Sequence, residues 1–149
     1  MARIEDYALI GDLQTAALVE RGGSIDWLCF PRFDSGACFA ALLGDPDNGR
    51  WLLAPAAGGT TSRSYRGETL VLETIWENDE GAVRVYDFMP PRGKAPDVVR
   101  IVEGIRGKVE IVRMFSPRVC GGARKQRPSG PATATRALSM RRTQGRIAP

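Results

Sequence analysis

Hydrophobic and polar positions alternate with a period of two over much of residues 64–115, the pattern of strands that bury one face. In SYRGETLVLETIWEN (residues 64–78), Leu70, Leu72 and Trp76 share one face. AVRVYDFMP, DVVRIVEGI and KVEIVRMF follow, separated by turn signals at DEG and near Arg106–Gly107. Strands that recur about every 8–12 residues predict an all-β fold, an antiparallel β-sandwich. We see no βαβ spacing that would indicate a parallel sheet.

Shorter segments precede this region. YALIGD, TAALVE and SIDWLCF predict three successive strands, with Gly22-Gly23 as a hairpin turn, and RWLLAP predicts another strand, which Pro55 ends. AAGGTTS (residues 56–62) predicts a loop. CFAALLG (Cys38–Gly44) contains helix-forming residues and stops at a glycine, so it predicts one short helix, with Ser35 as a candidate N-cap.

The alternation stops near Phe115. Residues 116–149 show no sustained periodicity and consist mainly of Gly, Pro, Ser, Thr, Ala and Arg. Such a segment buries too little apolar surface to offset the entropy of ordering it. We therefore predict a β-sandwich domain over residues 1–115, which we expect to be incomplete, and a disordered basic tail over residues 116–149.

Charge changes at the same place. Residues 1–115 hold all 17 acidic residues and 13 basic ones, whereas residues 116–149 hold the other 8 basic residues and no acid. One interpretation is a frameshifted end, because Arg, Pro, Ala, Gly and Ser are what GC-rich DNA encodes out of frame. The others are a genuine disordered tail and a segment that binds nucleic acid. Nucleic-acid binding is disfavoured, because the tail lacks interleaved aromatic residues.

Composition excludes several kinds of chemistry. The chain contains no histidine, which rules out Ser-His-Asp and Cys-His nucleophiles and histidine-ligated zinc. Cys29, Cys38 and Cys120 form no C-x-x-C pair, so we expect small buried hydrophobic residues and no cofactor. The start, MARIEDYALIGD, is too charged for a signal peptide, and no apolar run could span a bilayer. These features favour a cytoplasmic protein without a membrane partner.

Paired carboxylates can hydrolyse glycosidic bonds as acid and base. Asp12, Asp26, Asp34 and Asp87 are candidates in the folded part. Nothing in their spacing fixes two of them across a cleft. The alternative is that they lie at turns and strand ends, where they accept backbone hydrogen bonds.

The stretch SIDWLCFPRFDS (Ser24–Ser35) combines a strand pattern with a loop pattern. Pro31 removes a ladder donor and should end the strand, which leaves Arg32, Phe33 and Asp34 on a loop that could contact a sugar. In the alternative interpretation Trp27 and Phe30 are core residues, and Arg32 and Asp34 form a local ion pair. YDFMPPRG (Tyr86–Gly93) likewise predicts either a rigid docking loop or a stiff surface connection.

Several of these motifs occur together in one family. IEDYALIGDLQTAALVERGGSIDWLCFPRFDSGACFAALLGD, GRWLLAP, SYRGETLVLETIW and VRVYDFMPPRG resemble, in order, the start of bacterial glycoside hydrolase family 15 proteins, the trehalase-like and glucoamylase-like enzymes. The resemblance covers residues 3–113, and GSIDWLCFPRFDS is its most specific motif.

The resemblance implies an N-terminal β-sandwich that docks on a catalytic helical barrel of (α/α)6 type, whose two glutamates invert the anomeric centre of an α-glucoside. No residue here matches those glutamates, so we expect a truncated domain of a carbohydrate-metabolism enzyme that is inactive alone. It also implies that Trp27, Arg32, Phe33 and Asp34 lie on the substrate rim of the complete enzyme. A stand-alone module that binds α-glucans through Trp27, Phe33 and Trp51 is the alternative.

Overall fold

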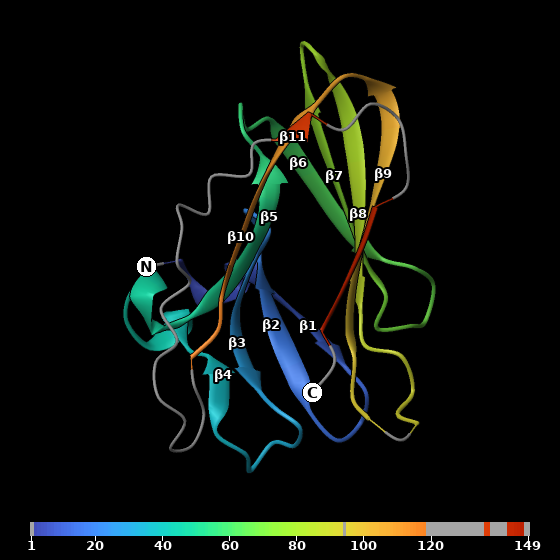
Figure 1. Cartoon of the computed structure of the whole chain (residues 1–149). Helices are drawn as coiled ribbons and strands as arrows, with labels where there is room; N and C mark the ends of the chain where they lie inside the picture. Colours follow the sequence, from blue (N-terminus) through green and yellow to red (C-terminus); the bar gives the residue numbers. More distant parts are fainter. Residues whose placement is uncertain (1, 94, 119–135, 138–142, 148–149) are drawn as a thin grey trace.

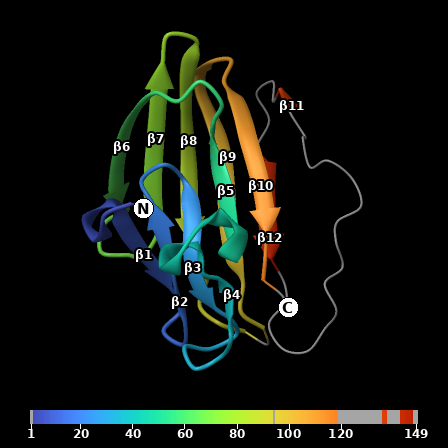
Figure 2. The ribbon, with the colours of Figure 1, turned by 90° about the vertical axis from the view of Figure 1, so that its left-hand side faces the viewer.

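Two antiparallel β-sheets pack face to face (Figures 1 and 2). This computed structural model describes residues 2–93, 95–118, 136–137 and 143–147. The predicted all-β sandwich is confirmed. In Figure 2 the sheet that contains β1, β2 and β3 lies in front of the sheet formed by β6 to β9.

The larger sheet has the order β1-β2-β3-β5-β10-β11, and β4 pairs with β3 on the side. Its strands are β1 (Tyr7–Gly11), β2 (Ala16–Glu20), β3 (Ser24–Cys29), β4 (Ala37–Phe39), β5 (Arg50–Pro55), β10 (Glu110–Ser116) and β11 (Arg136–Ala137). The smaller sheet has the order β12-β9-β8-β7-β6. Its strands are β6 (Thr60–Tyr65), β7 (Leu72–Asn78), β8 (Gly81–Phe88), β9 (Val98–Gly107) and β12 (Thr143–Ile147).

The period-two pattern decides which side chains lie between the sheets. In β7 the positions of Leu72, Thr74 and Trp76 are buried and alternate with half-buried ones. β1, β2 and β3 contribute the opposite wall. Its buried members in these three strands are Ala8, Ile10, Ala17, Val19, Ile25 and Leu28. Burial of this apolar surface is the main force that joins the sheets.

One ion pair lies inside this apolar layer. Arg100 of β9 forms a bidentate ion pair with Asp87 of β8, with Nε–Oδ1 and Nη2–Oδ2 distances of 2.8 and 3.0 Å. The same guanidinium donates to the carbonyls of Trp51 and Gly23 at 2.8 and 2.9 Å. Asp87 and Arg100 belong to the smaller sheet, whereas Trp51 lies in β5 of the larger sheet and Gly23 in the turn between its strands β2 and β3. Arg100 therefore connects the sheets.

The helix expected over Cys38–Gly44 is wrong. The chain forms β4, in which Phe39 pairs with Leu28, and then a single 3-10 turn at Ala41–Leu43. Phe39 is fully buried in the core, so packing against β3 outweighs the helix-forming tendency of the segment. Ser35 does not cap a helix; its hydroxyl accepts a hydrogen bond from the Arg32 amide at 3.2 Å.

Two further 3-10 turns complete the regular structure, at Ile4–Asp6 and Pro46–Asn48. The Asp45 carboxylate caps the second by accepting from the Asp47 amide at 3.0 Å. No helix among the described residues is long and apolar enough to cross a membrane.

The segment around residues 56–78 also differs from its prediction. The loop predicted over residues 56–62 ends earlier than expected, because β6 begins at Thr60 and pairs with β7. Residues 64–78 are not one strand, since the chain turns between Tyr65 and Leu72. That turn is closed by the Arg66 amide, which donates to Val71 O at 2.9 Å, and by the Thr69 hydroxyl, which donates to Arg66 O at 2.6 Å.

The prediction of a disordered tail concerns residues 116–149. The described parts of this segment are residues 116–118, which complete and follow β10, and the two strands β11 and β12. β11 pairs with β10 of the larger sheet, and β12 pairs with β9 of the smaller sheet. Residues 119–135, 138–142 and 148–149 lie outside the described residues, and for them the prediction stays a prediction.

Candidate functional site

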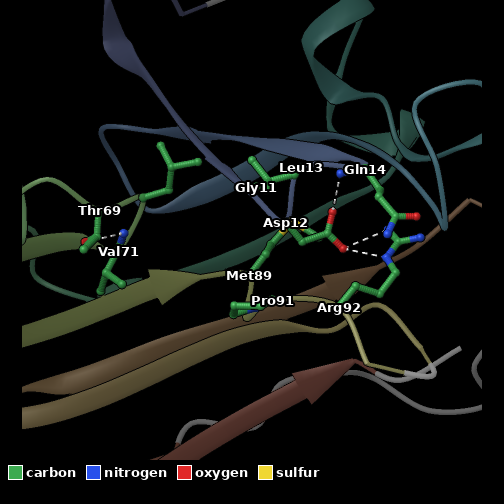
Figure 3. A pocket seen from close by; sticks show the side chains of 10 residues that line it. Gly11, Asp12, Leu13, Gln14, Thr69, Val71, Met89, Pro91 and Arg92 are labelled. Atoms are coloured by element: carbon green, nitrogen blue, oxygen red, sulfur yellow. Dashed lines mark hydrogen bonds and ion pairs between the residues drawn. The ribbon is translucent and has the colours of Figure 1, made fainter.

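Three loops meet at one end of the sandwich, the lower end in Figure 1. They connect β1 to β2, β3 to β4, and β8 to β9. Arg92, in the β8–β9 loop, joins them: its Nε and Nη2 each lie 2.8 Å from Asp12 Oδ2, and its Nη2 also donates to Pro31 O at 2.5 Å. Figure 3 shows the Arg92 guanidinium facing the Asp12 carboxylate. One cation therefore holds the three loops together.

The second oxygen of Asp12 organises its own loop. Asp12 Oδ1 accepts hydrogen bonds from the backbone amides of Gln14 and Thr15 at 3.0 and 2.9 Å. Burial acts to raise the pKa of Asp12, but the hydrogen bonds from Arg92, Thr15 and Gln14 outweigh it, so the pKa lies below its ordinary value. Asp12 is thus a charged, fully partnered carboxylate at neutral pH.

A pocket of about 570 Å³ opens beside this ion pair (Figure 3). It lies between the β1–β2 loop, the turn before β7, and the segment that follows β8. Its lining residues are Gly11, Asp12, Leu13, Gln14, Thr69, Leu70, Val71, Met89, Pro91 and Arg92. Most of these present carbon atoms. The pocket volume falls in the range typical of small-molecule sites, roughly 300–1,000 Å³.

The Arg32–Asp34 loop lies on the same end. Phe33 is 63% exposed, and its amide donates to Gln14 O at 3.2 Å, which fixes the loop to the β1–β2 loop. Arg32 Nε and Asp34 Oδ1 are 3.1 Å apart and both side chains are exposed. The structure therefore has the local ion pair of the alternative interpretation, on a loop that begins where Pro31 follows the end of β3.

Trp27 lies apart from this loop. The pairing of β3 with β2 shifts by one residue, so that Ile25 faces Val19 and Trp27 faces Leu18. Val19 and Ile25 are core residues, whereas Leu18 and Trp27 are half-buried on the other face of the sheet. The expectation that Trp27 is a core residue is not met. Phe30, in contrast, packs against the core as expected.

The glucan-binding alternative used three aromatic residues, Trp27, Phe33 and Trp51. They do not form one surface. Trp51 is 5% exposed and stacks under the Arg100 guanidinium, at 5.4 Å from ring centre to Cζ. Phe115 packs edge-on against it at 5.6 Å. Trp51 is thus part of the core, and of the three only Phe33 is freely exposed.

The four candidate carboxylates are each engaged separately. Asp12 pairs with Arg92, Asp34 with Arg32, and Asp87 with Arg100. The Asp26 carboxylate accepts hydrogen bonds from the Tyr7 hydroxyl at 2.9 Å and from the Ser24 hydroxyl. Burial and this bond to Asp26 raise the pKa of Tyr7. Each of the four carboxylates therefore has partners of its own.

Sequence reasoning missed Leu13, and it included Arg92 only as part of the Tyr86–Gly93 loop, without a role of its own. Leu13 is 93% exposed and has a positive φ of 71°, which is uncommon for a residue with a side chain. An apolar residue between Asp12 and Gln14 in a turn was the signal that could have marked it. Arg92 lies 80 positions from its partner Asp12, and no local pattern connects them.

Within the part of the chain that the structure describes, no three His, Cys, Asp or Glu side chains gather as metal ligands.

Known proteins resemble the chain over most of its length. A family model described as "Trehalase-like, N-terminal" matches residues 1–127. The chain belongs to the trehalase-like N-terminal domain family. The matched region includes the three joined loops, the pocket and the whole SIDWLCFPRFDS stretch.

Relatives of this trehalase-like N-terminal domain include three trehalases. The trehalase of Mycobacterium tuberculosis is 38% identical over 98 residues, which cover 65% of this chain and 14% of the relative. The trehalase of Thermoplasma volcanium is 35% identical over 124 residues, which cover 77% of this chain and 20% of the relative. Trehalase 2 of Sulfolobus acidocaldarius is 30% identical over 126 residues, which cover 84% of this chain and 21% of the relative.

The chain thus spans about a fifth or less of the length of these relatives. No solved structure matches the chain significantly.

Proposed function

We propose that the chain is the non-catalytic N-terminal domain of a trehalase-like enzyme of glycoside hydrolase family 15, and that it docks on a catalytic helical barrel that hydrolyses an α-glucoside. The observation that carries this proposal is the family match over residues 1–127. The two-sheet architecture supports a structural role, because it supplies a rigid platform with loops gathered at one end.

The state of the carboxylates supports a non-catalytic role. Inverting glycoside hydrolysis needs two carboxyl groups about 6.5–9.5 Å apart on opposite sides of the scissile bond. Asp12 and Asp87 are buried in ion pairs with arginine, and Asp26 is bound by two hydroxyl groups. A carboxylate held in this way is not free to act as a general acid. The acid and base would then come from the catalytic domain.

We further propose that Arg32, Phe33 and Asp34 form part of the substrate rim in the complete enzyme, with Trp27 on the adjoining sheet face. The exposure of Phe33 supports this, because an exposed aromatic ring on a fixed loop can pack on the apolar face of a sugar. Arg32 and Asp34 are exposed, so each could exchange its partner for a sugar hydroxyl at little cost.

A chimera with a relative tests the proposal. Residues 1–127 of this chain would replace the corresponding N-terminal part of the Thermoplasma volcanium trehalase, and glucose release from trehalose would be measured. We expect the chimera to hydrolyse trehalose, the same enzyme without any N-terminal domain to lose most of its activity, and the 149-residue chain alone to release no glucose.

Two outcomes would overturn this proposal. One is a folded chimera that is no more active than the deletion variant. The other is glucose release by the 149-residue chain alone above that of an Asp34→Ala control. Calorimetric titration of the chain with maltose would detect independent glucan binding as heat, whereas a docking domain gives none.

A further inference from the structure

We propose that the apolar pocket beside the Asp12–Arg92 ion pair is the surface on which the catalytic part of a trehalase-like protein docks, by inserting an aliphatic or aromatic side chain. The inference rests on the proposed function and adds the location and chemistry of the interface. In the following paragraphs the pocket rim denotes Leu13 and Leu70, which flank the pocket from two different loops.

The chemistry of the lining selects an apolar occupant. Met89, Pro91 and Val71 present carbon atoms to the pocket. Its charged members are Asp12 and Arg92, and each of them already neutralises the other at 2.8 Å. A charged ligand would therefore have to break a buried ion pair, whereas an apolar side chain would not.

Leu13 has a conformation that directs an apolar side chain away from the protein's own core. Its φ of 71° is unfavourable for leucine, and the backbone on both sides of it is fixed. Asp12 Oδ1 binds the amides of Gln14 and Thr15, and the Asp12 amide donates to Thr15 O at 3.2 Å. Strained residues of this kind persist where the surroundings enforce them, and they concentrate at functional sites.

Exposed apolar side chains of the pocket rim come from two loops. Leu13 is 93% exposed and Leu70 is 40% exposed, and Phe33 at 63% lies on the neighbouring loop that binds Gln14 O. Exposed apolar residues grouped around a concavity mark contact surfaces more often than isolated ones do.

The course of the chain brings the segment after β10 to the end of the sandwich on which the pocket opens. β10 runs toward β4, at the end of the sandwich that carries the joined loops (Figures 1 and 2). After β10 the Arg118 amide donates to Cys38 O at 2.7 Å, so the chain is tied to β4 at that point. The family match ends soon afterwards, at residue 127. In the trehalases, most of the polypeptide lies outside the matched part, and a following domain would begin near this end.

The surface is also rigid before it binds. Arg92 holds the β1–β2, β3–β4 and β8–β9 loops in one arrangement through Asp12 and Pro31 O. A preorganised surface loses less conformational entropy on docking.

The experiment uses the active chimera with a protease site placed after residue 127. After cleavage, the dissociation constant of the two parts would be measured for Leu13→Asp and Leu70→Asp. The matched controls are Leu43→Asp and Ile4→Asp, because Leu43 and Ile4 are 71% and 72% exposed and do not line the pocket. We expect each rim variant to weaken association at least tenfold, and each control to change it less than twofold.

The outcomes separate the two proposals. If the chimera is active but rim and control variants weaken association equally, the interface lies elsewhere, and the proposed function survives. If the chimera is inactive, the proposed function fails and this inference fails with it. If the isolated chain is a dimer that Leu13→Asp dissociates, a second copy occupies the pocket, and the proposal is overturned. Thermal unfolding of the isolated 149-residue variants verifies that a loss of association does not come from unfolding.

Discussion

At the scale of single residues, environment decides what an aspartate does in this domain. Asp12 has a side chain with no exposed surface, next to Arg92, whereas the Asp34 side chain is 73% exposed beside Arg32. Both are ion pairs, but only the buried one is shielded from solvent and fixed by further hydrogen bonds. Asp12 is therefore the carboxylate on which the geometry of the joined loops depends.

Asp12→Asn should destabilise the domain by about 2 kcal/mol at pH 7, because a buried charge-assisted hydrogen bond to Arg92 is lost. The lowered pKa of Asp12 gives this contribution a pH dependence. Because the pKa of Asp12 is lower in the folded state than in the unfolded state, ionised Asp12 stabilises the protein fully at pH values above the unfolded-state pKa, about 3.9. This stabilisation disappears as the pH falls through the folded-state pKa. Urea unfolding at pH 7 and pH 3 should show a smaller difference between wild type and variant at pH 3.

The matched control is Asp34→Asn, which breaks the exposed pair with Arg32. We expect a change below about 0.5 kcal/mol at either pH, because exposed ion pairs contribute little. Equal losses for the two variants at pH 7 would contradict the role assigned to Asp12.

Local contacts of the candidate site could be predicted from sequence, but distant ones could not. Arg32 and Asp34 are two positions apart, so a local ion pair is a direct consequence of their spacing. The partnership of Asp12 with Arg92 depends on how two sheets bring separate loops together, which no local periodicity encodes. The pocket escaped prediction for the same reason.

At the scale of elements, the alternating pattern predicted most strands and failed where local tendency and packing disagreed. β7 and β8 follow the predicted alternation, because one face of each is buried against the opposite sheet. The segment Cys38–Gly44 has residues that favour helix, but Phe39 fills a core position and pairs with Leu28 in β3. Helix propensity is worth less than burying such a side chain.

The edge of the larger sheet shows how one element protects another. β1 is the edge strand, and an unpaired edge offers its backbone groups to other chains. Tyr65, at the end of β6 in the other sheet, covers this edge: its hydroxyl accepts from the Leu9 amide at 2.9 Å and donates to Leu9 O at 2.8 Å. Arg63 supports the same edge by donating to Asp6 O at 2.9 Å.

Tyr65→Phe should therefore expose the backbone of Leu9 while keeping the aromatic ring. We expect faster hydrogen exchange at the Leu9 amide and a loss of about 1 kcal/mol in the free energy of unfolding. Tyr86→Phe serves as the control, because the Tyr86 hydroxyl contacts the Arg84 side chain at 3.4 Å and not a strand edge. Unchanged exchange at Leu9 in Tyr65→Phe would contradict this function of Tyr65.

At the scale of the whole molecule, the two sheets are joined by apolar packing and by one buried arginine. Asp87 occupies a buried position of β8 inside the sandwich, not the turn or strand-end position of the alternative interpretation. Its partner Arg100, and the carbonyls of Trp51 and Gly23 that Arg100 binds, follow only from the packing of the sheets. Gly23 is required there: its φ is 89°, and a Cβ would lie 2.3 Å from Leu53 O.

Arg100→Met should lower the free energy of unfolding by about 3–5 kcal/mol, because it leaves the Asp87 carboxylate buried without its partner. A domain of this size has a total stability of only about 5–15 kcal/mol, so much of the folded population would be lost. Urea unfolding at pH 7, followed by tryptophan fluorescence, measures this change, since Trp51 lies against the Arg100 guanidinium.

The double variant Asp87→Leu/Arg100→Met separates the ion pair from the packing. Replacing both charges removes the unpaired carboxylate, so the double variant should be more stable than Arg100→Met alone. It should remain less stable than wild type, because the carbonyls of Trp51 and Gly23 lose their donor in both variants. If Arg100→Met alone cost less than about 1 kcal/mol, the connection between the sheets would be apolar packing only, and Arg100 would not couple them.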